Sequence, residues 1–287
     1  MLTETQPVCA TETSDIPVRN IRPGSDGMLY GLRELWQFRE LVFFFALRNI
    51  SVRYKQTVLG FGWVIVQPLV YSGLFGIVFG RFAQLPSQGK PYALFSLCGL
   101  IPWMAFSSAF LGSSMSVVAE QSILKKVYFP KLASVFSTLG VVFMDAFVQC
   151  LLLLIMLGIY HQPFSVSLML CIPLIFLAGL SGMAAGIWLS ALNVRYRDVQ
   201  FVMPFLVQMW MYASPVAYAS SIVPKDLLPI FALNPVAPLI DCFRWATLDV
   251  QGLPPQNIGY TLVFIVLCLG LGIANFKRME IHFADEV

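Results

Sequence analysis

The sequence predicts an all-α integral membrane protein with six transmembrane helices, an N-terminal amphipathic interfacial helix and two short re-entrant extracytoplasmic helices before the last span. Six apolar segments are long enough to cross a hydrocarbon core of roughly 30 Å as helices. The composition agrees, because a chain of 287 residues with 58% hydrophobic and only 11% charged residues has more apolar surface than a soluble core needs. The six segments are residues 61–80, 92–119, 132–160, 166–192, 199–223 and 258–276.

The basic residues predict how these segments are oriented. With both termini in the cytoplasm, 14 of the 18 lysines and arginines lie on the cytoplasmic side of the membrane. Arg81, Lys90, Lys225 and Arg244 remain outside. The positive-inside rule favours this topology. The net charge of +3 then belongs to loops beside anionic lipid, and no nucleic acid partner is expected.

Several function classes are disfavoured because their motifs are missing. The six cysteines are scattered singly, without the CxxC or Cys/His spacing of a metal site. No GxxxxGK[ST] segment is present to cradle nucleotide phosphates. The chain is therefore not expected to be an enzyme or to bind a cofactor, and ATP-driven work would need a separate polypeptide.

The chain divides into four segments. Residues 1–28 are expected to form a flexible cytoplasmic tail, since they carry acids, prolines and glycines but no signal-peptide pattern. Residues 29–57 place large apolar residues at helical spacing between charges, which is typical of a helix lying in the membrane interface. Packing of this helix on a soluble partner is the alternative. Residues 58–277 form the six-helix domain, and residues 278–287 form a second cytoplasmic tail.

The longest extracytoplasmic link, residues 220–257, is not uniformly polar. Its segment 227–240 is mostly apolar but is interrupted by Pro229, Pro235 and Pro238. Interrupted apolar backbone near membrane depth is tolerated where it packs on protein or lines a cavity. We therefore expect two short re-entrant helices in this link.

Asp145 is the one carboxylate deep in a predicted span. Such a residue is by default a functional candidate, often in a proton pathway. The sequence shows no second buried acid or basic partner for a relay, so we favour a hydrogen bond between packed helices, with Gln149 one turn later as a partner.

Five short motifs occur in order along the chain. They are RYKQTVLGFGW from Arg53, KKVYFPK from Lys125, NVRYRDV from Asn193, SPV from Ser214 and NPVAPLIDCFR from Asn234. With these motifs, residues 29–277 resemble the permease subunits of ABC-2 type exporters for O-antigen, capsule and teichoic-acid polymers. The resemblance implies a homodimer in the bacterial inner membrane, working with two copies of an ATPase subunit that binds ATP and Mg. It also implies a lipid-linked polysaccharide as cargo.

Arg53 and Lys55 lie where the interfacial helix meets the first span. At the cytoplasmic headgroup level, their side chains can bind a lipid pyrophosphate as well as membrane phosphates. Plain anchoring at the interface is the alternative.

A stripe of aromatic and amide residues follows one face of the first span. Its members recur every four residues, and the fifth span offers a similar pair. Rings can stack on sugars while amides and phenols exchange hydrogen bonds with hydroxyls, which suits a sliding polysaccharide. Helix packing or interface anchoring is the alternative. The expected conduit residues are Trp63, Gln67, Tyr71, Phe75, Gln208 and Tyr212.

Two short cytoplasmic segments, residues 120–131 and 193–199, are expected to contact the ATPase. Their coupling residues would be Glu120, Lys125, Lys126, Tyr128, Phe129, Arg195, Arg197 and Asp198. A solvated loop is the alternative for the second segment. In the last motif the resemblance points to an extracytoplasmic gate at Asn234, Pro235 and Arg244.

Together these inferences predict the permease subunit of an ATP-driven exporter that carries an undecaprenyl-linked polysaccharide, with O-antigen for lipopolysaccharide biosynthesis as the expected case. The nearest alternative is an ABC-2 drug or lipid exporter, whose pathway would hold fewer sugar-stacking aromatics. An ion-coupled secondary transporter would need inverted repeats and paired ionisable groups, and an intramembrane enzyme would need a convergent catalytic cluster. Neither pattern occurs in the sequence.

Overall fold

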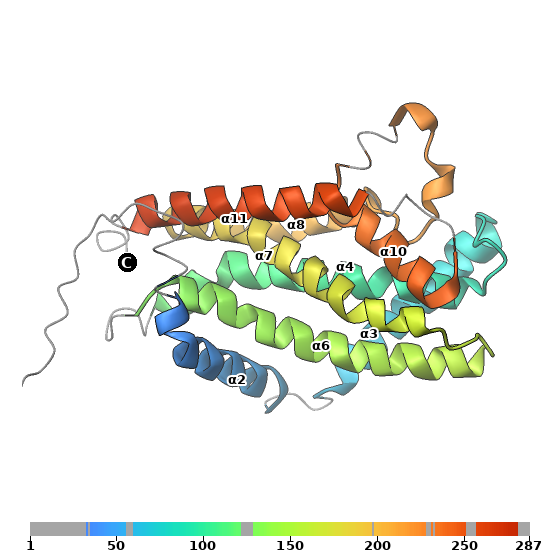
Figure 1. The fold of residues 1–287 in the computed structure, drawn as a ribbon, viewed down its shortest axis with the longest axis horizontal. Helices are drawn as coiled ribbons and strands as arrows, with labels where there is room; N and C mark the ends of the chain where they lie inside the picture. The colour runs from blue at the N-terminus through green and yellow to red at the C-terminus, as the bar shows by residue number, and fades with distance from the viewer. Residues whose placement is uncertain are drawn as a thin grey trace, which may run out of the picture.

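The computed structural model describes residues 33, 35–55, 60–121, 129–196, 198–227, 231, 233–250 and 257–280. Within these residues the chain is all-helical, as predicted (Figure 1). The helices are α2 (Arg39–Lys55), α3 (Gly62–Phe75), α4 (Tyr92–Ala119), α6 (Leu132–Ile159), α7 (Cys171–Arg195), α8 (Val199–Tyr212), α10 (Ala237–Leu248) and α11 (Ile258–Glu280). Helix α3 continues as the π-helix η1 (Gly76–Phe82), and the 3-10 helix η2 (Val166–Leu170) leads into α7.

Five of the six predicted spans are helices long and apolar enough to cross a membrane. The fifth predicted span is the exception, because α8 ends at Tyr212 after 14 residues. The chain turns there, and Ser214 precedes Pro215, which disfavours a helical conformation at Ser214. The prediction of one continuous helix over residues 199–223 is therefore wrong for its second half.

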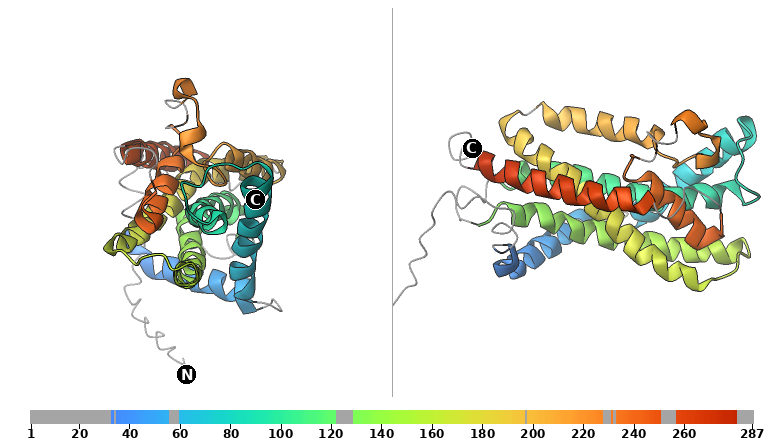
Figure 2. Two further views of the ribbon diagram at one scale, coloured as in Figure 1. Left: turned by 90° about the vertical axis from the view of Figure 1, so that its right-hand side faces the viewer. Right: turned by 45° about the horizontal axis from the view of Figure 1, so that its top comes forward.

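Helix α4 lies at the centre of the bundle. Seen along the helices, it is surrounded by the other long elements (Figure 2), and 78% of its most apolar stretch is buried, against 22% for α3 and for α11. It packs most closely on α7, where a Cβ at Gly182 would lie 2.1 Å from the carbonyl oxygen of Phe106. Small residues let helices in a membrane approach this closely. The α4–α7 pair is thus the closely packed centre of the fold.

The outer faces of the bundle are apolar. Val70 on α3, Phe201 on α8 and Leu271 on α11 expose 62%, 74% and 68% of their surface. A monomer in water rarely exposes apolar area on this scale. These faces are suited to lipid or to a second subunit, in agreement with an integral membrane protein.

Helix α2 packs lengthwise against the first half of α6. The side-chain amide of Asn49 donates to Ser137 over 3.1 Å, and Tyr54 at the end of α2 donates to Asp145. Next along the chain, the ring of Phe61 stacks on Tyr54 at 4.0 Å, just before α3 begins. Asp145 is thus level with the start of the first span. From Asp145 to the end of α6 at Ile159 the helix rises only roughly 21 Å, which is shorter than the thickness of a hydrocarbon core.

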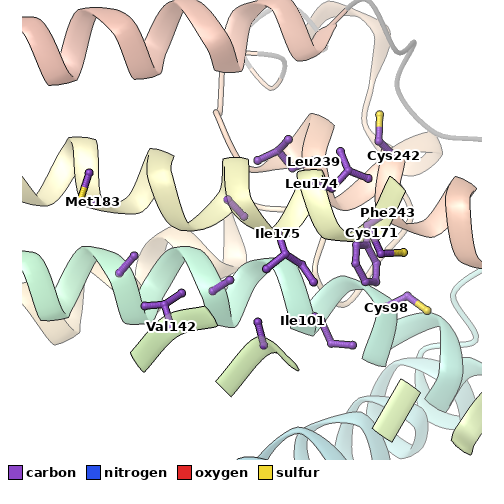
Figure 3. Close-up of a cluster of buried hydrophobic side chains, with 14 of the residues drawn as sticks. Cys98, Ile101, Val142, Cys171, Leu174, Ile175, Met183, Leu239, Cys242 and Phe243 are labelled. Carbon is purple, nitrogen blue, oxygen red and sulfur yellow. The ribbon is translucent and has the colours of Figure 1, made fainter. Parts of the chain in front are cut away.

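Helix α10 is the one helix of the predicted re-entrant pair that the described residues contain. It packs against α4 and α7 and contributes Leu239 and Phe243 to the main apolar core (Figure 3). Residues 228–230 and 232, where the other helix was expected, lie outside the described residues. The same applies to residues 1–32, 34, 281–287 and part of the predicted interfacial segment, whose orientation in the membrane stays a prediction.

Candidate functional site

Helices α3, α4, α6 and α8 enclose a groove with a volume of about 630 Å³, and the end of α2, with the half-exposed Arg53, lines one end of it, the mouth of the groove. Each helix turns one face toward it. The lining side chains that carry polar or aromatic groups are Arg53, Tyr54, Trp63, Gln67, Tyr71, Trp103, Ser107, Ser108, Asp145, Gln149 and Gln208.

The polar lining contrasts with the apolar character of these helices. Gln67 lies on the groove face of α3, Gln149 on that of α6 and Gln208 on that of α8. Polar side chains inside apolar helices are costly toward lipid and are typical of a pathway for a polar substrate. The groove therefore combines aromatic rings with amide and hydroxyl groups along its length.

The predicted conduit residues divide between the groove and the protein core. Trp63, Gln67, Tyr71 and Gln208 line the groove. Phe75 instead is only 6% exposed and packs in a second apolar cluster between α3, α4 and the chain after α8. Tyr212 is 60% exposed and accepts a hydrogen bond from Gln208, but it does not line the groove. Phe75 thus has a packing position, and the stripe that faces the groove ends at Tyr71.

Asp145 has a basic partner that sequence reasoning missed. Arg53 Nη2 lies 2.8 Å from Asp145 Oδ2, and the Tyr54 hydroxyl donates to Asp145 Oδ1. Burial and the hydrogen bond to Asp145 raise the pKa of Tyr54 above its usual range, so Tyr54 stays a neutral donor. Gln149 donates to the sulfur of Met104 instead. No local spacing could reveal these contacts, because α2 and α6 are far apart in the sequence.

Lys55, the second residue of the predicted headgroup site, is exposed at the last turn of α2. It lies next to the Arg53–Asp145 pair along the chain but does not line the groove. A lipid-phosphate contact through Arg53 and Lys55 remains a prediction.

The predicted ATPase-coupling loop is described only at its two ends, and both ends contact α2. Glu120 forms an ion pair with Arg48. The ring of Phe129 packs edge-on against that of Phe45, with 5.0 Å between the ring centres. Lys125, Lys126 and Tyr128 fall in the part of the loop outside the described residues.

The second predicted coupling segment follows α7. Arg195 and Asp198 are exposed, and Arg197 between them lies outside the described residues. The preceding Asn193 is buried and donates to the carbonyl oxygen of Ser114 on α4. The turn is therefore anchored to the central helix, while Arg195 and Asp198 beside it are exposed.

Arg244 of the predicted gate is completely buried rather than exposed to the outer solution. Its guanidinium donates to the carbonyl oxygens of Phe95, Val216 and Tyr218, and Asp241 lies 3.9 Å away. Burial lowers the pKa of Arg244 to about 10, which leaves it charged at neutral pH. Arg244 thus joins α10 to α4 and to the non-helical residues that follow α8.

Asn234 also holds α8 and the residues after it against the start of α10. Its carbonyl oxygen accepts from the Trp210 indole over 3.1 Å and caps the backbone amide of Val236, while its amide donates to Ser214 over 2.8 Å. Pro235 is buried, and its carbonyl oxygen accepts from Thr261 on α11. The last motif therefore fixes the turn between α8 and α10, and its role as a gate remains a prediction.

Residues 40–248 match the model of the ABC-2 type transporter family. The chain belongs to this family. The match extends from α2 through α10, so every groove residue of this ABC-2 transporter lies within it.

Relatives of this ABC-2 transporter have names that refer to polysaccharides. The O-antigen export system permease protein RfbA of Myxococcus xanthus is 31% identical over 269 residues, which cover 91% of this chain and 100% of the relative. A Klebsiella pneumoniae protein of the same name is 29% identical over 269 residues, covering 90% and 98%. The polysialic acid transport protein KpsM of Escherichia coli is 23% identical over 244 residues, covering 82% and 91%.

Proposed function

We propose that this chain is the permease subunit of an ATP-driven exporter that moves a lipid-linked polysaccharide, most specifically O-antigen, across the bacterial inner membrane. The observation that carries the proposal is the groove, in which aromatic, amide and hydroxyl side chains follow one another along apolar helices. The named relatives support the choice of cargo.

The chemistry of the groove suits a sugar chain. Trp63 and Tyr71 offer flat faces to the apolar sides of pyranose rings, and Gln67 and Gln208 offer both donors and acceptors to hydroxyls. None of these groups is charged, so no single sugar is held strongly. A polymer could therefore slide through the groove in steps.

The groove is one half of the proposed pathway. It is lined by α3 and α8, whose outer faces also expose large apolar side chains such as Val70 and Phe201. A two-fold pair of subunits can join two such grooves into a conduit wide enough for a hydrated polymer. We therefore propose a homodimer.

Energy is proposed to come from two copies of a separate ATPase subunit, which would bind ATP and Mg. ABC-2 permeases rely on such a subunit, and this chain carries no GxxxxGK[ST] segment. Contact is proposed through the loop between α4 and α6 and the turn after α7, on the cytoplasmic side.

Reconstituted transport tests this proposal. The chain and its ATPase are incorporated into vesicles with polyprenyl-diphosphate-linked O-polysaccharide in the outer solution, and polymer protected from an added glycosidase is measured. We expect protection that requires ATP and both subunits. ATP-driven movement of an amphipathic drug or a phospholipid, with no protection of the polymer, would favour the drug or lipid exporter instead.

A further inference from the structure

The groove lining contains two charged residues among the described part of the chain, Arg53 and Asp145, and they pair with each other at the α2 end. The two partners differ in exposure: the side chain of Asp145 is 10% exposed and that of Arg53 is 48% exposed. The carboxylate is therefore largely enclosed by protein, while the Arg53 side chain at the mouth of the groove is half exposed.

We propose that Asp145 is a positioning residue, a counter-ion that holds Arg53 at the mouth of the groove and competes for it with the phosphate groups of an anionic polyprenyl diphosphate. This inference rests on the proposed function, since it assigns a docking cation to the lipid end of that cargo. When the diphosphate arrives, Arg53 exchanges Asp145 for it. When the diphosphate leaves, Arg53 returns to Asp145.

The geometry leaves Arg53 able to bind a second anion. One of its terminal nitrogens contacts one carboxylate oxygen, while the other carboxylate oxygen accepts from Tyr54. A guanidinium has five N–H donors in a planar fork, which matches phosphate oxygens well. Arg53 can therefore make its first contact with a phosphate through donors that Asp145 does not use, before it leaves the carboxylate, and Tyr54 keeps the carboxylate in place.

The competition makes binding reversible. Each Arg53 donor that turns to the diphosphate loses its attraction to the Asp145 carboxylate, and the attraction between opposite charges is strong at short range in a partly buried site. Asp145 therefore lowers the affinity for the headgroup while it favours release. A transport site needs this balance, because a substrate that binds too tightly does not leave.

The test measures affinity and turnover separately. The purified complex of permease and ATPase is placed in phosphatidylcholine nanodiscs, and binding of a short-chain polyprenyl diphosphate and the ATP hydrolysis that it stimulates are measured. For Asp145→Asn, which keeps an acceptor for Tyr54, we expect roughly three- to tenfold tighter binding, the range for loss of one close charge interaction. Stimulated hydrolysis should fall, because release is slowed. A merely structural role would lower both quantities together.

Arg53→Gln serves as the second variant. It should abolish the preference for polyprenyl diphosphate over uncharged polyprenol. The double variant, which removes both charges and so leaves no buried ion unpaired, should bind as Arg53→Gln does. A further change in affinity on adding Asp145→Asn to Arg53→Gln would overturn the proposal, because the effect of Asp145 would then not pass through Arg53.

Controls separate the sources of phosphate and the underlying claims. Asp249→Asn makes the same chemical change at an exposed residue with φ 55°, a conformation that Asn tolerates, and should leave binding unchanged. Inorganic pyrophosphate and phosphatidylglycerol should compete weakly; competition by either at the strength of the polyprenyl diphosphate would overturn the lipid-diphosphate assignment. A wild-type complex that does not distinguish diphosphate from polyprenol would overturn the proposed cargo as well. A further outcome is that the wild-type complex discriminates as expected while Asp145→Asn binds the polyprenyl diphosphate no more tightly than the wild type does. In that case the counter-ion role fails and the proposed cargo stands.

Discussion

Arg244 is a fully buried charged residue, and each nitrogen of its side chain has a hydrogen-bond partner. Its three nitrogens donate to carbonyl oxygens from α4 and from the segment after α8, and its guanidinium lies 3.8 Å from the centre of the Phe95 ring. A Cβ at Gly99 would lie 2.6 Å from Arg244 Nη2, so α4 leaves just enough room for it. If the guanidinium were removed, these carbonyl oxygens would be left without a hydrogen-bond donor in the core.

We expect Arg244→Lys to destabilise the protein by about 2 kcal/mol or more, since an ammonium cannot reach three carbonyl groups in different directions. The measurement is the thermal midpoint of the purified protein in detergent, read from intrinsic tryptophan fluorescence. Arg81→Lys makes the same change at an exposed position and should leave the midpoint unaltered. Equal midpoints for the two variants would contradict the structural role of Arg244.

At the residue scale, the sequence could name candidates but not their partners. Gln67 and Tyr71 were predicted to share a face with Trp63, and the helix period was enough to place them together in the groove. The same period also assigned Phe75 to the stripe, although the core between α3 and α4 takes it up. The Arg53–Asp145 pair depends on how α2 packs against α6, and tertiary packing of this kind leaves no local signal.

At the scale of elements, α2 joins the loop between α4 and α6 to the mouth of the groove. Arg48 and Phe45 contact the two ends of the loop, and Arg53 and Tyr54 on the last turn contact Asp145. A helix is stiff over this length, so a displacement of the loop would move both ends of α2 together. ATP-driven movement at the loop could thereby reach the groove.

This connection predicts a charge-swap experiment on Arg48 and Glu120. Arg48→Glu alone and Glu120→Arg alone place like charges together, and each should lower the amount of polymer exported per ATP hydrolysed at least roughly threefold, with the complex still assembled. Combining both substitutions restores an ion pair and should restore coupling. A double variant that is as uncoupled as the singles would show that the pair does not transmit the movement.

The loop itself is expected to contact the ATPase. Reversing the charge at Lys125 and Lys126, or replacing Tyr128 by alanine, should weaken assembly or separate hydrolysis from export, because the docking side chains are lost; Phe129 is left unchanged, since it is only 4% exposed and packs on Phe45. Co-purification of the ATPase and the export-to-hydrolysis ratio measure the two effects. Unchanged values for all these variants would remove the docking role.

Apolar length in the sequence predicted the continuous spans correctly, and it failed where local chemistry ends a helix early. The spans in α4, α6, α7 and α11 follow directly from uninterrupted apolar length. The apolar character of residues 199–223 is equally continuous, yet Pro215 and the hydrogen bonds of Asn234 to Ala213 and Ser214 end α8 early. Hydropathy registers polarity only, so it could not detect that turn.

At the scale of the whole molecule, the division of labour between two polypeptides has a direct consequence. The purified chain alone should neither bind nor hydrolyse ATP, because its sequence has no GxxxxGK[ST] segment to cradle nucleotide phosphates. Hydrolysis should appear only when the ATPase subunit is added, as measured by phosphate release. Robust hydrolysis by the isolated chain, freed of contaminating ATPases, would exclude the proposed arrangement.

The groove and the outer surface of α3 make different predictions for water access, which is the most direct test of the whole assembly. Gln67 and Tyr71 face the groove, whereas Val70 between them is 62% exposed on the outer face. If two grooves form a hydrated conduit, single cysteines at Gln67 or Tyr71 should react with water-soluble thiol reagents, and faster during ATP turnover. A cysteine at Val70 should stay slow, because lipid or the second subunit covers it.

Alanine substitutions on the same helix separate conduit from packing. Replacing two of Trp63, Gln67 and Tyr71 should impair export of long polymer while expression and dimerisation persist, because sugar contacts are lost but each of these side chains is more than a third exposed. Phe75→Ala provides the contrast: its ring is only 6% exposed, so its loss should lower stability by about 3 kcal/mol. If the groove variants lose dimer and expression in proportion to export, as Phe75→Ala should, the stripe packs against protein and the aromatic conduit must be abandoned.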